Sequence, residues 1–253
     1  MPTSRFIPPL LAVVLWASAC GPTASARPHA GRSASVDVTP TTAHPVAAPP
    51  LPPGVTEVAA MDVETPASRV PGGPPVATVP QSWYGFPSVL PIIERQPGWI
   101  EVREAQKPNE STAWIPEKDA AIGTTAYRLV LHLATTRLQE LRDSRQVADF
   151  PAGIGTARTP TPAGHFFVTM KAPAPSAGYG PFVLVTSGHS DTITDWEASG
   201  DAITAIHGPI DAASDARIGT TGARVSDGCI RLHDRDLAQL ADIPAGTPLD
   251  VEA

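Results

Sequence analysis

The 253-residue sequence has only two cysteines, Cys20 and Cys229, and its lysines and arginines form no cluster. With a net charge of −7 it offers phosphates no basic face, so nucleic acid is not an expected partner. The sequence has no His-x-x-His or Cys-x-x-Cys pair and no glycine-rich phosphate loop, so we expect neither a metal nor a cofactor. The apolar run near the N-terminus is too short to span a bilayer.

Residues 1–20 have the pattern of an export signal. Arg5 precedes a largely apolar run, Phe6–Trp16, and three small residues follow it. Cys20 comes directly after them, so the segment resembles a bacterial lipobox, in which this cysteine is lipidated and anchors the protein to the membrane. Ala17 departs from the Leu or Val usual at its position, and ordinary secretion with cleavage nearby is the alternative. We therefore expect an exported protein at the outer face of the cell membrane or in the periplasm.

The thirty prolines concentrate in the first third of the chain. Residues 21–80 consist mainly of Pro, Ala, Thr and Val, which predicts a disordered tether because few side chains there can form a core. Residues 81–124 alternate short apolar pieces with turn residues and predict a small β module. Its segments Gln96–Arg103 and Ala113–Pro116 resemble the SH3-like β-barrels found ahead of wall enzymes. Trp99 and Trp114 could line a peptide groove there, but core packing is the expected role.

Residues 125–253 predict a second folded unit that is mainly β. Asp143–Arg145 indicates a hairpin turn, and only Asp234–Ala241 indicates a helix, with Asp234 as its cap. Short β-prone runs recur at sandwich-like spacing along the unit: Leu129–Leu133, Arg137–Leu141, Phe166–Met170, Phe182–Thr186, Ala202–Ile206 and Leu249–Val251.

Three motifs occur in this second unit, and two of them contain residues with reactive side chains. Gly155–Phe166 reads Gly-Thr-Ala-Arg-Thr-Pro-Thr-Pro-Ala-Gly-His-Phe, Ala205–Pro209 contains His207, and Ser226–Leu232 reads Ser-Asp-Gly-Cys-Ile-Arg-Leu. In this order they resemble the YkuD-type L,D-transpeptidase family, and the resemblance covers about half of the chain. It implies a β-sandwich of the L,D-transpeptidase type with one or two short helices.

The chemistry of Cys229 and His207 supports a catalytic role for this pair independently of the family resemblance. A thiol with an ordinary pKa near 8.5 is only a few per cent thiolate at neutral pH, so a nucleophilic cysteine needs a nearby base. His207 can take the Cys229 proton and later donate it to the departing amine, provided that a further group holds the ring in the right tautomer. The family resemblance implies that this group is a backbone carbonyl, here that of Gly208.

Further residues around this pair are candidates for substrate binding. Gly228 permits the turn that points backbone N–H groups, including that of Cys229, at a developing oxyanion. Arg231 suits a substrate carboxylate or the architecture of the site, and Ser226 suits a substrate hydrogen bond or the bracing of the loop. His189 follows a predicted strand and is the competing candidate for the base.

Two features depart from the family pattern. The stretch between His207 and Cys229 is longer than usual, which indicates an insertion. Asp227 stands where another residue is common, and its carboxylate raises the thiol pKa unless Arg224 or Arg231 offsets it. These two features are the only support for an inactive wall-binding lipoprotein.

The resemblance implies acyl transfer between peptidoglycan stem peptides without a cofactor. Cys229 would release D-alanine from a tetrapeptide donor, and a stem amine would resolve the thioester into a 3-to-3 cross-link. It also implies acylation by carbapenem-type inhibitors. Resolution by water or by a protein lysine stays open, giving an L,D-carboxypeptidase or a protein-to-wall attachment enzyme. A Cys–His peptidase fits poorly, because its cysteine would precede its histidine.

Overall fold

The computed structural model of the protein describes residues 51–194 and 201–253, which fall within one compact unit, Pro49–Ala253. The predicted export signal, the lipidation site Cys20 and the tether as far as residue 50 lie outside the described residues. Within the described ranges, we find no helix with the length and apolar character needed to cross a membrane.

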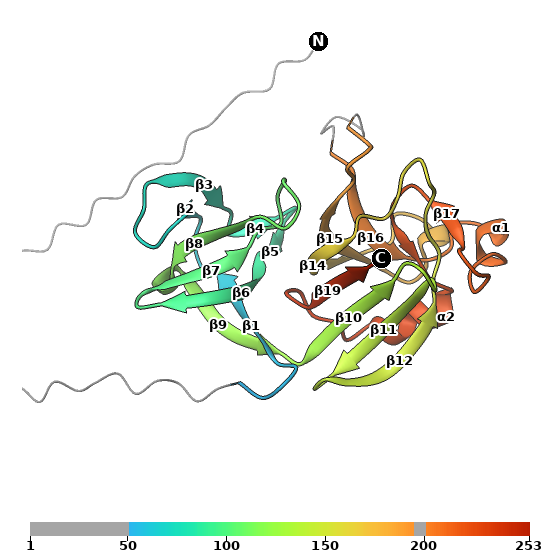
Figure 1. Cartoon of the computed structure of the whole chain (residues 1–253), viewed down its shortest axis with the longest axis horizontal. Helices are drawn as coiled ribbons and strands as arrows, with labels where there is room; N and C mark the ends of the chain where they lie inside the picture. The colour runs from blue at the N-terminus through green and yellow to red at the C-terminus, as the bar shows by residue number, and fades with distance from the viewer. Residues whose placement is uncertain (1–50, 195–200) are drawn as a thin grey trace, which may run out of the picture. The chain divides into compact units, whose positions relative to one another are not determined.

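The first part of the described chain forms a seven-stranded sheet of order β3-β2-β8-β7-β6-β1-β9 (Figure 1). Its strands are β1 Thr56–Met61, β2 Thr65–Ser68, β3 Pro75–Val79, β6 Val89–Gln96, β7 Trp99–Arg103, β8 Thr112–Pro116 and β9 Ala120–Thr125. A short hairpin, β4 Ser82–Trp83 with β5 Phe86–Pro87, and the 3-10 turn η1 Glu117–Asp119 complete this part.

The prediction of a disordered tether through residue 80 is wrong from Thr56 onward, because β1, β2 and β3 lie there. The strand β1 pairs with β9 and β6, and β2 pairs with β8, all of which come later in the chain. Ala59 and Ala67 are fully buried in the sheet core, and Val79 is nearly so. In the sequence these residues indicate no strand, because the strands that bury them come much later in the chain.

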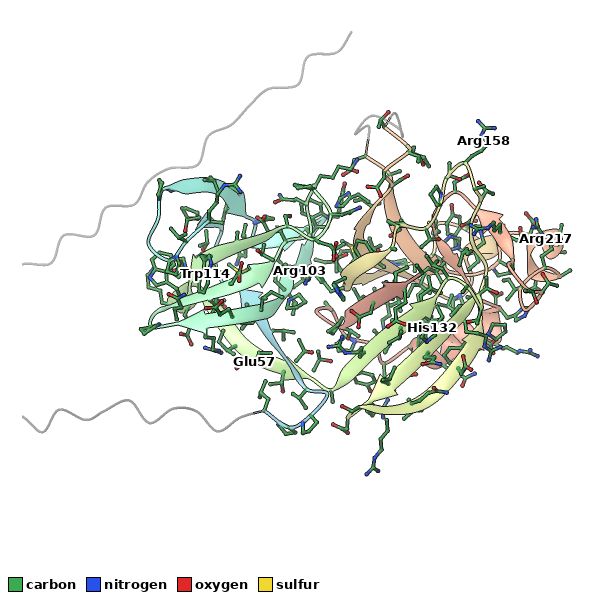
Figure 2. All side chains as sticks on the ribbon, viewed as in Figure 1. Glu57, Arg103, Trp114, His132, Arg158 and Arg217 are labelled. Atoms are coloured by element: carbon green, nitrogen blue, oxygen red, sulfur yellow. The ribbon has the colours of Figure 1, made fainter. Side chains whose placement is uncertain are left out.

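Trp114 on β8 is 6% exposed and belongs to the interior, as expected for core packing (Figure 2). Trp99 on β7 is half-buried. The likeness of this sheet to an SH3-like barrel stays a prediction.

The second part forms an eight-stranded mixed sheet of order β12-β11-β10-β19-β14-β15-β16-β18. Its strands are β10 Tyr127–His132, β11 Arg137–Arg142, β12 Arg145–Pro151, β14 Gly164–Ala172, β15 Val183–His189, β16 Ile203–His207, β18 Ile230–Arg231 and β19 Pro248–Glu252. A separate pair, β13 Ile154–Gly155 with β17 Arg224–Ser226, lies beside β18. The helical turns are η2 Ala177–Tyr179, α1 Ala212–Asp215, α2 Asp234–Leu237 and η3 Ala238–Leu240.

One hydrophobic core joins strands that are far apart in the sheet order. Leu138 and Phe150, on β11 and β12, share a cluster with Ile206 and Ile230, on β16 and β18 at the other edge. A flat sheet of eight strands could not bring its two edges together, so the sheet curls around this core. The prediction of a mainly β protein with few short helices is confirmed.

The predicted strands of this part are present, with β12, β13, β17 and β18 in addition. Asp143 and Ser144 have φ values of 50° and 62°, as a tight hairpin turn between β11 and β12 requires. The predicted helix 234–241 consists of α2 followed by η3, and its N-cap is His233 instead of Asp234. The sequence reasoning missed α1, which lies in the long loop after His207.

Candidate active site

Strand pairing brings the two reactive residues together at one edge of the sheet. β16 and β18 are parallel, with Ile206 opposite Ile230 and His207 opposite Arg231. Because side chains alternate along paired strands, the two isoleucines point into the core and His207 and Arg231 point to the other face. Cys229 comes one residue before β18 and opposite Ala205, whose backbone hydrogen-bonds the thiol. The alternation therefore places Cys229, His207 and Arg231 on one face.

His207 is held in a single orientation by its own neighbour. Its Nδ1 lies 2.7 Å from the Gly208 carbonyl oxygen, the contact implied by the family resemblance. A carbonyl only accepts, so Nδ1 carries the hydrogen and the lone pair is on Nε2. The side chain is 2% exposed, and this burial lowers the pKa of His207 to about 4, with a smaller lowering from Arg231. The ring is therefore an uncharged base at neutral pH.

Gly208 fits its place because it has no side chain. Its N–H donates to the Tyr179 carbonyl at 2.8 Å, and the Tyr179 ring lies 4.7 Å from the His207 ring. A Cβ on Gly208 would lie 2.5 Å from Asp234 Oδ1 and 2.7 Å from the Gly180 nitrogen. The turn that holds the imidazole therefore requires glycine.

We expect Gly208→Ala to lower the rate of Cys229 acylation by about 100-fold, because relief of these clashes displaces the carbonyl that orients His207. The measurement is the acylation rate with a carbapenem, beside a thermal unfolding curve. Gly123→Ala on β9 is the matched control, because its nearest neighbour would be Val58 Cγ2 at 3.6 Å. A Gly208→Ala protein that reacts at the wild-type rate would contradict the role given to this turn.

The turn before Cys229 is tied by side-chain hydroxyls. Gly228 has a φ of 117°, a conformation that favours glycine. Ser226 Oγ donates to the Cys229 carbonyl at 2.6 Å and accepts the Gly228 N–H at 3.3 Å. Since Ser226 is 3% exposed, it braces the loop, which is one of the two roles considered for it. Its hydroxyl is not presented to a substrate.

The electrostatic surroundings of Cys229 disfavour the thiolate in the resting protein. Burial raises the pKa of the Cys229 thiol most, and the Asp227 carboxylate raises it further. A backbone hydrogen bond from Ala205 and the positive charge of Arg231 act in the opposite direction. The expected opposition between Asp227 and Arg231 is therefore present, whereas Arg224 donates to the Gly155 carbonyl instead.

Thr161 is a site residue that the sequence reasoning did not single out. Its Oγ1 donates to the Gly228 carbonyl at 2.9 Å and accepts the Gly155 N–H at 2.9 Å. Thr159 Oγ1 likewise donates to Asp227 Oδ1 at 3.1 Å. The Thr-Pro-Thr-Pro motif could have pointed to these threonines. In the structure, their hydroxyls support the loop before Cys229. Tyr179, the aromatic cover of His207, had no such signal.

Arg231 is held by the long loop after His207. Its Nη1 lies 2.9 Å from Ser214 Oγ and 3.4 Å from the Pro209 carbonyl, and its Nε is buried without a partner. These contacts are architectural, since they attach the segment around α1 to the edge of the sheet. A substrate carboxylate at this guanidinium stays a prediction.

The prediction that His189 contacts the substrate, or replaces His207 as base, is wrong. The residue is 1% exposed, with Nε2 at 2.8 Å from the Ala105 carbonyl and Nδ1 at 2.9 Å from Asp201 Oδ1. Both ring nitrogens therefore have hydrogen-bond partners other than the thiol. His189 joins the two sheets of the described chain.

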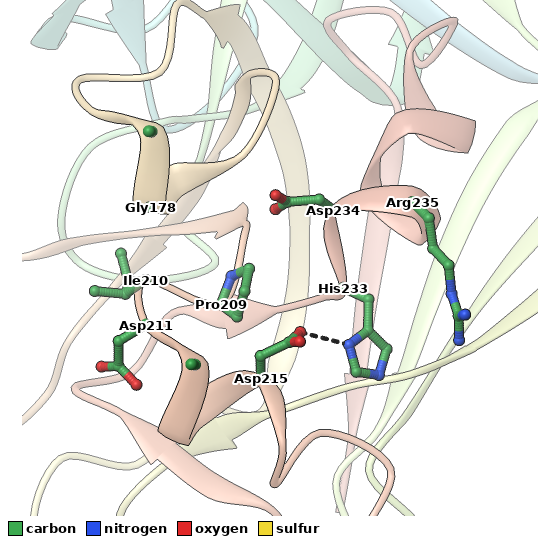
Figure 3. Close-up of a pocket in the computed structure, with 10 residues that line it drawn as sticks. Gly178, Pro209, Ile210, Asp211, Asp215, His233, Asp234 and Arg235 are labelled. Carbon is green, nitrogen blue, oxygen red and sulfur yellow. Dashed lines mark hydrogen bonds and ion pairs between the residues drawn. The ribbon is translucent and has the colours of Figure 1, made fainter.

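A cavity of about 570 Å³ has Pro209, the residue after Gly208, among its lining residues (Figure 3). It is lined by segments that follow the two site strands, Pro209–Ala212 after β16 and His233–Arg235 after β18, and by Gly178. His233 Nδ1 and Asp215 Oδ1 pair across it at 2.6 Å. Across residues 51–194 and 201–253, His, Cys, Asp and Glu form no group of three or more suited to a metal.

The fold and the site together indicate an acyl-transferring enzyme with a β-rich catalytic domain. Residues 126–251 match the model of the YkuD family, described as the L,D-transpeptidase catalytic domain. A relative described as an L,D-transpeptidase YkuD, from Bacillus licheniformis, is 30% identical over 129 residues, which cover 51% of this chain and 67% of that protein. The chain therefore belongs to the YkuD L,D-transpeptidase family.

Solved structures were also compared with the chain. An L,D-transpeptidase from Mycobacterium smegmatis is 17% identical, covers 61% of this chain and 91% of its own, and has a TM-score of 0.39. LdtMt1, an L,D-transpeptidase solved in complex with imipenem, is 17% identical, covers 80% of this chain and all of its own, and has a TM-score of 0.41.

Proposed function

We propose that this protein forms 3-to-3 cross-links between peptidoglycan stem peptides, with Cys229 as nucleophile and His207 as general base. The supporting observation is the parallel register of β16 and β18. It sets the one cysteine of residues 51–194 and 201–253 on the same face as an uncharged imidazole whose Nε2 is available. Family membership supplies the reaction class, transpeptidation at an L,D bond.

The first half of the reaction breaks the donor peptide bond. His207 Nε2 takes the proton of the Cys229 thiol as the sulfur attacks the carbonyl of the bond to the terminal D-alanine of a tetrapeptide stem. The tetrahedral intermediate collapses to a thioester, and the leaving amine of D-alanine takes the proton from His207. Because the resting pair is a thiol and a neutral imidazole, proton transfer accompanies the attack.

The second half resolves the thioester. A side-chain amine of a neighbouring stem attacks the thioester carbonyl, His207 accepts the amine proton, and the thiolate of Cys229 recovers it when the carbon–sulfur bond breaks. The Cys229 N–H, at the turn made by Gly228, is the proposed donor to the oxyanion in both halves.

Attachment to the membrane through Cys20, and acylation by carbapenems, belong to the same proposal. The export signal predicts action outside the cytoplasm, where the wall is built. The strained carbonyl of a β-lactam can acylate the thiol. Stem amines cannot easily remove the acyl group that is then bound to the sulfur. LdtMt1, whose structure contains imipenem, is an example of such a complex in another L,D-transpeptidase.

Incubation of purified tetrapeptide muropeptides with the full chain tests the reaction. We expect 3-to-3 dimers and free D-alanine in equal amounts, measured by chromatography with mass spectrometry, and neither product with Cys229→Ala. Tripeptides with D-alanine but no dimers would indicate a carboxypeptidase. Neither product, together with tight binding to purified wall, would indicate an inactive binding protein and overturn the proposal.

A further inference from the structure

The loop between β7 and β8, residues 104–111, binds the end of β15 through one amide side chain. Asn109 Nδ2 donates to the His189 carbonyl at 2.8 Å, and Asn109 Oδ1 accepts the His189 N–H at 2.8 Å. A neighbouring strand would offer a backbone residue the same two partners. Asn109 therefore completes the hydrogen bonding of the last residue of β15 from a different sheet.

The same loop also holds the side chain of His189. Its Nε2 lies 2.8 Å from the Ala105 carbonyl oxygen, and its Nδ1 lies 2.9 Å from Asp201, which pairs with Lys107 at 3.0 Å. Two residues of this loop, Asn109 and Ala105, thus hold the main chain and the ring of His189.

A third attachment lies at the beginning of β14. Glu110 Oε1 accepts the His165 N–H at 2.9 Å. Gly164, with a φ of 140°, leaves room for the carboxylate, since a Cβ there would lie 3.0 Å from Glu110 Cδ. The loop therefore contacts both β14 and β15, which are neighbours in the sheet that bears the active site.

Buried hydroxyls connect this end of β15 with the cysteine loop. Thr204 Oγ1 donates to the Gly188 carbonyl at 3.1 Å and lies 2.7 Å from Thr186 Oγ1. Thr204 is followed on β16 by Ala205, whose backbone hydrogen-bonds the Cys229 thiol. A path of hydrogen bonds and strand backbone therefore leads from the end of β15 to Cys229 through Gly188, Thr204 and Ala205.

We propose that Asn109 and His189 are positioning residues for acyl transfer, which act by fixing β15 and, through Thr204, the loop that presents Cys229. The contacts of Asn109 and Ala105 with His189 are called the clamp below. The seven-stranded sheet then contributes to catalysis, since its loop 104–111 holds β15, the strand that pairs with β16. This inference rests on the proposed function, because the reaction that it affects is acylation of Cys229.

Acylation of the full chain by imipenem is the test. For Asn109→Ala we expect the first-order rate at saturating imipenem to fall about 10- to 100-fold, with little change in the half-saturating concentration, because the clamp orients reacting groups. Amide hydrogen exchange in β15 and β16 should become faster. Lys107→Ala removes only a half-exposed ion pair and should change the rate less than about twofold.

Gln81→Ala is the matched control, since Gln81 Nε2 also donates to a backbone carbonyl, that of Asp62 at 2.7 Å, but within the seven-stranded sheet. Its rate should equal that of the wild type. Wild-type acylation and exchange in Asn109→Ala would overturn the inference, as would equal losses in Asn109→Ala and Gln81→Ala. If the wild-type chain forms no adduct, the proposed function fails, and exchange in Asn109→Ala still tests the clamp.

Discussion

Replacing Cys229 with alanine should abolish the covalent adduct with imipenem, while the wild-type chain gains one imipenem per protein in an intact-mass spectrum. The adduct requires a sulfur nucleophile within reach of a base, and His207 on the paired strand is the proposed base. Loss of the nucleophile removes the acyl-enzyme altogether, so the expected effect is complete.

The chain contains a matched control for this experiment, because it has one other cysteine. Cys20→Ala should leave the adduct unchanged, since Cys20 has no assigned part in acyl transfer. An adduct that persists in Cys229→Ala, or that disappears in Cys20→Ala, would contradict the assignment of the nucleophile. The comparison separates reaction at the proposed site from nonspecific modification of thiols.

His207→Ala should lower the second-order rate of acylation about 10²- to 10⁴-fold at pH 7 and change its dependence on pH. In the wild type, the pKa of His207 is lowered to about 4 by burial, so the ring can accept a proton at every pH above that value. The rate should therefore fall only as the pH decreases through about 4, where Nε2 becomes protonated.

Without the imidazole, the thiolate must form by ionisation to solvent. Because burial raises the pKa of the Cys229 thiol, the rate of His207→Ala should increase with pH across the neutral range, and the acid limb near pH 4 should be lost. Rates of imipenem acylation between pH 4 and 9 provide the measurement. A variant whose profile has the wild-type shape would exclude His207 as the base.

The clamp at His189 gives the N-terminal sheet a role in the same chemistry. If Asn109 holds the strand beside the active-site edge, then separation of the two sheets would slow acylation even with every reacting residue present.

Much of the catalytic domain could be predicted because its signals are local. Alternation and β-branched residues mark strands such as β10 and β14, and Asp143–Ser144 marks the hairpin turn. The limit of the tether could not be predicted, because Ala59 and Ala67 acquire their burial from strands much later in the chain. The helical turn α1 is only four residues long, which is too short for a helical period to appear.

The sequence by itself determined which residues could do chemistry: a solitary thiol in the second unit, a histidine before it in the order of the YkuD family, and a glycine beside each. It favoured His207 as the base by motif order but left His189 open as a competing candidate, since both are histidines near the end of a strand. Tertiary structure decided this by bonding both ring nitrogens of one and leaving Nε2 of the other available. The physical reason is that the fold decides which groups reach a histidine ring, and Ala105, whose carbonyl bonds His189 Nε2, lies 84 positions away along the chain.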